Sequence, residues 1–141
     1  MDLVDLDPGD PRLATEVFPV LHELRPHLTG ESFAAVYAEA HPQGLRFTAL
    51  YDDGRCVAVA GWRVVATSSV LRKLYVDDLV TTATARSRGH GRALLAALAD
   101  RARQAGCHAI DLDSGVQREG AHRFYEREQM ALTSYHFARR L

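Results

Sequence analysis

Hydrophobic positions in the first third of the chain recur at helical spacing. Between residues 14 and 24, apolar side chains lie three and four positions apart, which predicts a helix. Pro19 lies inside this pattern, where a proline kinks or splits a helix, and Pro26 ends it. Thr29 is a typical N-cap for a second helix, which ends before Pro42.

Strand patterns dominate the middle of the chain. Apolar, β-branched and aromatic residues predict strands at Leu45–Tyr51, Arg55–Val65 and Val70–Thr81. Asp52–Gly54 separates the first two and is typical of a hairpin turn. The short links between these strands favour an antiparallel meander. A further short strand over residues 3–6 precedes the helices.

The remaining residues predict alternating helices and strands. A long helix over residues 91–105 ends at Gly106. A strand at His108–Asp113 and a short helix at Glu119–Glu128 follow, and a final strand is predicted at Leu132–Ala138. This order indicates a mixed α/β fold.

Length and composition narrow the class of protein. The 141 residues suffice for a single domain, here residues 1–141, and are too few for two ordinary ones. The net charge of −1 gives no broad electrostatic field for nucleic acid or a membrane surface. The sequence lacks a signal-peptide pattern and an apolar run of about 20 residues. Cys56 and Cys107 lack metal-ligand spacing, so we expect a reduced, cytoplasmic protein without a metal.

A turn rich in arginine and glycine lies between the strand that ends at Thr81 and the long helix. Its residues are Arg86, Ser87, Arg88, Gly89, His90 and Gly91. The unpaired backbone N–H groups and the macrodipole of a helix start suit a phosphate, and glycine lets the backbone approach it. The alternative is a tight turn whose arginines are only solvated.

Two further features accompany the turn. Asp77 and Asp78 are adjacent in the preceding strand, and Ala121-His122-Arg123-Phe124-Tyr125 forms part of a late helix. With these, the chain resembles the GNAT superfamily of N-acetyltransferases: the turn matches the pattern Gln/Arg-x-x-Gly-x-Gly/Ala, and the helix matches Ala-x-x-Phe-Tyr. Residues 109–137 look closest to small bacterial members that include the aminoalkylphosphonate acetyltransferases.

The resemblance implies a central, mostly antiparallel sheet with one parallel, splayed pair of strands, flanked by about four helices. It also implies acetyl-CoA as the acetyl donor. The pantetheine arm is expected to pair with the backbone of Leu79, Val80 and Thr81, and the pyrophosphate to bind the turn from Arg86 to Arg92.

Acetylation of an amine requires a base, because only about one in two thousand lysine-like amines is neutral at pH 7. Asp77 and Asp78 are the candidates. Neighbours in a regular strand point to opposite faces, so only one of them is expected to face the cleft, and we favour Asp78. The short aspartate side chain favours a relay through water. The alternative is that both are solvated or ion-paired carboxylates.

Tyr125 matches the tyrosine that protonates the leaving thiolate in this superfamily. The alternative is that Phe124 and Tyr125 only pack their helix onto the sheet. We see no cysteine or serine paired with a base, so direct attack of the amine on the thioester is expected. The sequence departs from its relatives at Gln129, where they have glycine, and at Arg118, where many have asparagine.

The expected function is acetyl transfer to a small-molecule amine. Asp77, Asp78, Asp111 and Asp113 lie on neighbouring strands and favour a cationic acceptor. The rivals are a protein acetyltransferase acting on N-termini or lysines and a non-catalytic CoA-binding sensor. Homodimers are frequent among relatives, and the predicted final strand is the expected pairing edge.

Overall fold

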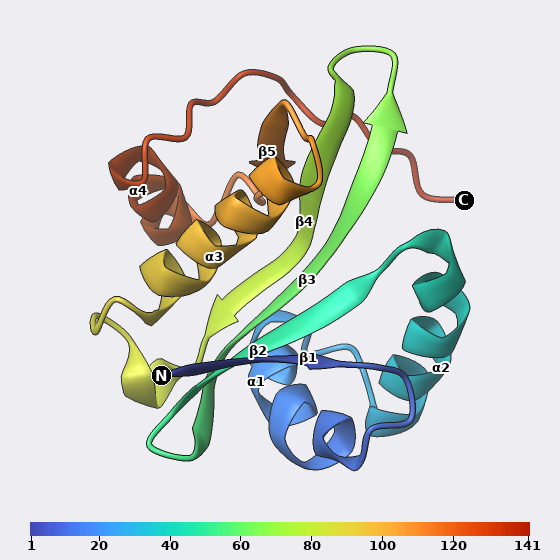
Figure 1. Cartoon of the computed structure of the whole chain (residues 1–141), viewed down its shortest axis with the longest axis vertical. Helices are drawn as coiled ribbons and strands as arrows, with labels where there is room; N and C mark the ends of the chain where they lie inside the picture. The colour runs from blue at the N-terminus through green and yellow to red at the C-terminus, as the bar shows by residue number, and fades with distance from the viewer. The chain divides into compact units, whose positions relative to one another are not determined.

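A computed structural model describes residues 1–141, which divide into two compact units, residues 1–111 and residues 112–141. The first unit contains a sheet and three of the four α-helices (Figure 1). Its strands are β1 (Asp2–Leu6), β2 (Arg46–Asp52), β3 (Arg55–Thr67), β4 (Leu71–Thr81) and β5 (Ala109–Leu112). Its α-helices are α1 (Phe18–Leu24), α2 (Gly30–Ala40) and α3 (His90–Gln104).

The strands form a five-stranded sheet in the order β1-β2-β3-β4-β5. The first four strands pair antiparallel, which confirms the meander, and β5 runs parallel to β4. Asp53 and Gly54 both have positive φ, 50° and 75°, as a two-residue hairpin turn requires. The N–H of His108 donates to the carbonyl of Arg72, and Lys73 pairs with Asp111, so β5 is held at the start of β4.

The first predicted helix is split, as Pro19 suggested. Leu13–Val17 forms a π-helical turn, and α1 then begins at Phe18 with Pro19 in its first turn. Proline has no N–H to donate to a carbonyl four residues earlier, and it is well tolerated at a helix start. The wider turn therefore precedes the proline, and the helix continues regularly after it.

Helix α2 begins as predicted. The N–H of Ser32 donates to Oγ1 of Thr29, and the N–H of Thr29 donates to Oγ of Ser32, which completes a capping box. Phe33 and Tyr37 are buried on the face of α2 that packs on the sheet, and both rings contact Phe47 edge-on. This aromatic cluster is part of the main core, which lies between the sheet and helices α1 and α2.

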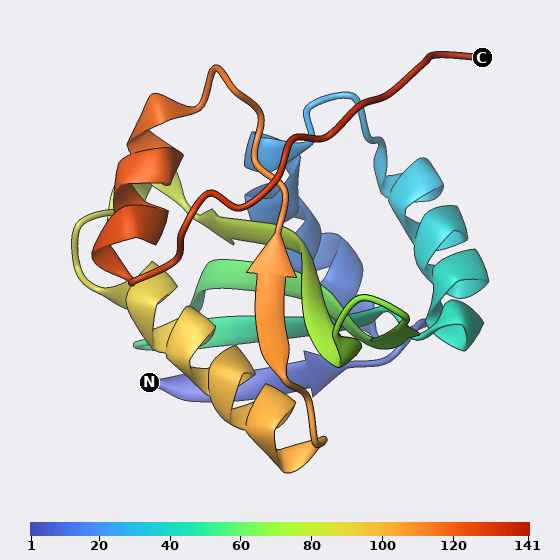
Figure 2. The same cartoon turned by 90° about the horizontal axis from the view of Figure 1, so that it is seen from above.

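Helix α3 covers the opposite face of the sheet (Figures 1 and 2). Leu94, Leu98 and Ala102 are buried along one side of this helix, at the spacing of a core-facing stripe. Arg101 donates to Asp5 and Thr48 and lies 5.5 Å from the centre of the Trp62 ring. The sheet is thus enclosed by helices on both faces, and the segment between β4 and α3 lies at its rim.

The unit of residues 112–141 contains α4 (Glu119–Arg127). Gln129 follows the helix with φ 63°, and the N–H of Met130 donates to the carbonyl of Tyr125. This is the left-handed ending that glycine usually provides, so glutamine serves the same role at some cost in strain.

The predicted final strand is absent. Residues 130–141 form no helix or strand, and Leu132, Tyr135 and Phe137 are exposed. Apolar and aromatic residues of this kind are common in strands, but a strand forms only where a partner accepts its backbone hydrogen bonds. The edge expected for a homodimer is therefore not a strand in the single chain.

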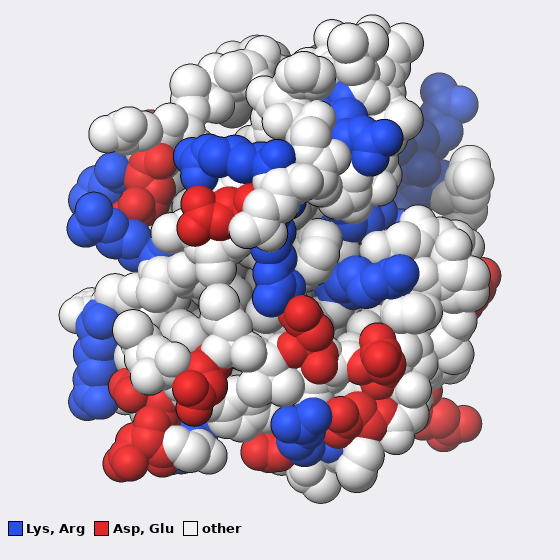
Figure 3. Space-filling view, viewed as in Figure 1, with Lys and Arg blue, Asp and Glu red and all other residues white.

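The surface carries both signs of charge. On the face drawn in Figure 3, acidic side chains lie beside basic ones, in keeping with the net charge of −1. No helix has the length and apolar content to cross a membrane.

Tyr37 provides a test of this core. Its hydroxyl donates to the carbonyl of Leu6 at 2.6 Å and accepts from the N–H of Phe47 at 3.2 Å. Tyr37→Phe leaves both buried groups without this partner, so we expect a loss of about 1–3 kcal/mol in the free energy of unfolding, measured by urea denaturation. Tyr135→Phe, at an exposed tyrosine, is the control and should change stability by less than about 0.5 kcal/mol. Equal stability of the two variants would contradict the assigned hydrogen bonds.

Candidate active site

A β-bulge in β4 positions the acidic pair. Gly61 of β3 lies opposite Asp78, whereas the next residue, Trp62, lies opposite Val76. Asp77 is therefore the extra residue of β4, and the regular alternation of side chains breaks there. Asp77 and Asp78 line the same pocket, so the expectation that they face opposite ways is wrong. That expectation assumed a regular strand.

Two arginines neutralise this pair. Arg63, in β3, donates from Nε and Nη2 to the two carboxylate oxygens of Asp77, each at 3.0 Å. Arg25, directly after α1, donates from Nε to Oδ1 of Asp78 at 2.7 Å and from Nη2 to the carbonyl of Asp77 at 3.0 Å. Each aspartate thus has its own guanidinium partner.

Asp78 is the more enclosed of the two carboxylates. Its side chain is 14% exposed, against 23% for Asp77. Burial raises the pKa of Asp78 above its ordinary value, and the nearby Asp77 adds to this, while the charge of Arg25 opposes it. Gly61 leaves room for the side chain of Asp78, because a Cβ at residue 61 would lie 2.9 Å from Oδ2 of Asp78 and 2.9 Å from the ring of Phe47.

The pocket beside the acidic pair has a volume of about 340 Å³. Its charged side chains are Arg25, Arg63, Asp77 and Asp78, with His27 at its rim. The rest of its wall is apolar and comes from α1, the loop after it, α2, the residue before β2 and β2 itself: Leu21, Leu28, Phe33, Val36, Ala40, Leu45 and Phe47. We call this the acceptor pocket. It offers a carboxylate of raised pKa beside an apolar surface.

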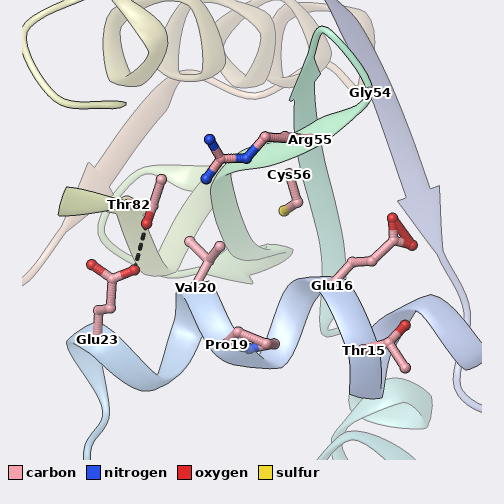
Figure 4. Close-up of a pocket in the computed structure, with 9 residues that line it drawn as sticks. All are labelled: Thr15, Glu16, Pro19, Val20, Glu23, Gly54, Arg55, Cys56 and Thr82. Atoms are coloured by element: carbon pink, nitrogen blue, oxygen red, sulfur yellow. Dashed lines mark hydrogen bonds between the residues drawn. The ribbon is translucent and has the colours of Figure 1, made fainter. Parts of the chain in front are cut away.

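A second pocket, of about 320 Å³, is lined by residues of α1 and the turn before it, by the start of β3 and by Thr82 (Figure 4). Glu23 projects from α1 here and accepts from Oγ1 of Thr82 at 2.6 Å and from the N–H of Ala83 at 2.9 Å. Burial raises the pKa of the Cys56 thiol in this pocket to about 12, so the thiol stays protonated and is a poor nucleophile.

The backbone of the arginine- and glycine-rich turn is accessible at Gly89. Ser87 and Gly89 have φ of 64° and 80°, and Gly89 is the N-cap of α3, whose start has no side-chain cap. A Cβ at Gly89 would meet no atom within 4 Å, so the space beside the backbone is open. The ring of His90 is instead buried, with Nε2 3.6 Å from the carboxylate of Asp52. A 15-residue helix that begins this way is suited to an anion.

Tyr125 lies in α4, where its ring and that of Phe124 are 5.4 Å apart. Burial raises the pKa of the Tyr125 phenol above its ordinary value, and the Arg118 guanidinium opposes this rise. The phenol is therefore protonated at neutral pH and can donate a proton.

Sequence reasoning missed four residues of the site. Arg25 and Arg63 pair with the aspartates, Gly61 makes room for Asp78, and Glu23 holds the segment after β4. Only Arg63 gave a signal, as a charged residue within an apolar strand. No group of three or more histidine, cysteine, aspartate or glutamate side chains is placed to hold a metal ion.

Comparison with known proteins gives consistent matches. The model of the acetyltransferase (GNAT) family matches residues 12–129. An uncharacterized N-acetyltransferase of Bacillus subtilis strain 168, YhdJ, is 36% identical over 124 residues, which cover 86% of this chain and 87% of that protein.

Two solved structures share the fold. A ribosomal-protein-alanine N-acetyltransferase from Brucella melitensis biovar Abortus 2308 superposes with a TM-score of 0.82 and 20% identity, over 100% of both chains. The aminoglycoside N-acetyltransferase AAC(6')-Iy, in complex with CoA, superposes with a TM-score of 0.83 and 14% identity, over 99% of this chain and 93% of that one.

Gly61 provides a test of the geometry around Asp78. In Gly61→Ala the added methyl group would press on Asp78 and on the buried ring of Phe47, so we expect a loss of about 1–3 kcal/mol in unfolding free energy. Gly30→Ala is the control, since its Cβ would meet nothing within 4 Å at the start of α2, and it should be neutral or stabilising by up to about 1 kcal/mol. A Gly61→Ala protein as stable as the parent in urea would contradict the close approach.

Proposed function

The chain belongs to the acetyltransferase (GNAT) family, and on that premise we propose that it transfers the acetyl group of acetyl-CoA to the primary amine of a small molecule. The observation that carries the proposal is the acceptor pocket, where a largely enclosed carboxylate of raised pKa adjoins a small, mostly apolar cavity. A volume of about 340 Å³ lies at the small end of ligand sites and fits a small molecule.

The donor is proposed to bind along β4 and the turn that follows. The backbone of Leu79, Val80 and Thr81 would pair with the pantetheine arm, and the amides from Ser87 to Arg92 would bind the pyrophosphate. The open backbone at Gly89 and the uncapped start of α3 support this assignment. Arg86, whose Nε lies 3.4 Å from the carbonyl of Thr81, joins the turn to the strand end.

We assign the base to Asp78. The amine nitrogen attacks the thioester carbonyl carbon and forms the new C–N bond, and its proton passes to Asp78 directly or through water. Asp77 is the weaker candidate, because Arg63 occupies both of its oxygens. Collapse of the tetrahedral intermediate breaks the C–S bond, and Tyr125 supplies a proton to the leaving thiolate. The raised pKa of the phenol keeps this proton available.

Two alternative functions predict different results in an activity assay. A protein acetyltransferase would have to accept a peptide in preference to a small amine. A CoA-binding sensor would bind CoA tightly and turn over no acceptor. Thiol release from acetyl-CoA with a panel of amines, amino acids and peptides separates these functions.

Removal of the Asp78 carboxylate tests the base. We expect Asp78→Asn to lower kcat/KM by about 10²- to 10⁴-fold, and Asp77→Asn to have a smaller effect. The base acts in its deprotonated form, so activity should rise as the pH passes the pKa of Asp78, which is raised above that of an ordinary aspartate. Asp78→Asn should remove this rise of activity with pH. Asp100→Asn, in an exposed ion pair on α3, is the control. Full activity of Asp78→Asn would rule out the assignment.

Tyr125→Phe tests the acid. The variant keeps the ring and loses the proton, so kcat should fall at least about tenfold while KM for acetyl-CoA changes little. Tyr135→Phe, at an exposed tyrosine, should leave both constants unchanged. A neutral Tyr125→Phe would show that this tyrosine only packs its helix.

A further inference from the structure

The charges of the acceptor pocket are balanced. Asp77 and Asp78 contribute two negative charges, and Arg25 and Arg63 contribute two positive ones, each within 3.0 Å of its partner. Asp111, which sequence reasoning grouped with them, pairs with Lys73 at 2.9 Å. The pocket therefore has no surplus negative charge to hold a polycation, and the expectation of a cationic acceptor loses its basis.

The two side chains of the Arg25–Asp78 ion pair differ in their exposure to solvent. The Asp78 side chain is 14% exposed, and that of Arg25 is 42% exposed. The negative end of the pair thus lies deep in the pocket and the positive end lies toward solvent. Arg25 donates to Oδ1 of Asp78, so an amine that binds this oxygen competes with the guanidinium for it. The released guanidinium, 42% exposed, is then open to an anion of the acceptor, and a charge-assisted hydrogen bond to that anion would favour binding.

An acceptor that carries its own anion can bind both Asp78 and Arg25 at once. Its amine replaces Arg25 at Asp78, and its carboxylate replaces Asp78 at Arg25, so every charge keeps a partner. The remaining wall of the pocket is apolar, with Phe33, Leu45 and Phe47 among its residues. An apolar side chain on the acceptor would cover this wall and be removed from water.

On the basis of the proposed function, we infer that the acceptor is a zwitterionic amine with an apolar side chain, such as an α-amino acid of the leucine type. Its amine would lie beside Asp78 and its carboxylate beside Arg25. Polycationic amines and amines without an anionic group would be poor acceptors. A peptide has its carboxylate far from its N-terminal amine, so it would also lack an anion placed to bind Arg25.

The experiment compares leucine with leucinamide, which has the same amine and side chain but no carboxylate. Thiol release from acetyl-CoA gives kcat/KM for both, and we expect leucine to be favoured about tenfold or more, as for loss of a charge-assisted hydrogen bond. An amide, a leucine-initiated peptide or a polyamine that matches leucine would overturn the inference.

Arg25→Gln tests the role of the arginine. The change also alters the surroundings of Asp78, so the readout is the ratio of kcat/KM for leucine to that for leucinamide, because an effect on the base lowers both alike. We expect this ratio to fall to about one, and Arg25→Lys to restore part of it. Arg103→Gln, in an exposed pair with Asp100, should leave the ratio unchanged. An unchanged ratio in Arg25→Gln would refute the assignment.

Failure of the proposed function gives a separate result. If no acceptor is turned over, the small-molecule transferase is refuted, and calorimetry of the CoA-loaded protein still decides the present inference. Tighter binding of leucine than of leucinamide would support it, and equal or absent binding of both would overturn it.

Discussion

The site depends on one irregularity in the pairing of β3 with β4. A regular ladder would place Asp77 and Asp78 on opposite faces of the sheet. The bulge opposite Gly61 and Trp62 brings both carboxylates to the same pocket, on the face that α1 and α2 cover. Two partly buried carboxylates side by side repel each other, and compensating cations relieve this repulsion. Arg25 and Arg63 provide them from two different elements.

Helix α1 joins the two sides of the site within the first unit. Arg25, at its end, holds the acidic pair, and Glu23, two residues earlier, holds Thr82 and Ala83 after β4. The strand segment between these two anchors is the one proposed to pair with the pantetheine arm. Helix α1 and the residue after it therefore contact the chain on both sides of this segment. Because Pro19 lies in the first turn of α1, the rest of this helix is regular.

Local sequence signals predicted most of the elements. The turn at Asp53–Gly54, the cap at Thr29 and the start of α3 each depend on a few neighbouring residues, and each is found. The bulge was missed because it depends on the register between two strands, which no single segment encodes. The partners of the aspartates were missed for the same reason, since Arg25 lies 53 positions from Asp78. The prediction of a final strand was wrong because the residues of this segment cannot by themselves supply a hydrogen-bonding partner.

A crystal structure of the protein with CoA and N-acetylleucine tests the arrangement most directly. The two ligands are the products expected from acetyl transfer to leucine. We expect the amide nitrogen of N-acetylleucine beside Asp78, its carboxylate on Arg25, and the bulge at Asp77 preserved. An amide nitrogen bound away from Asp78, or a carboxylate that makes no contact with Arg25, would contradict the proposed site.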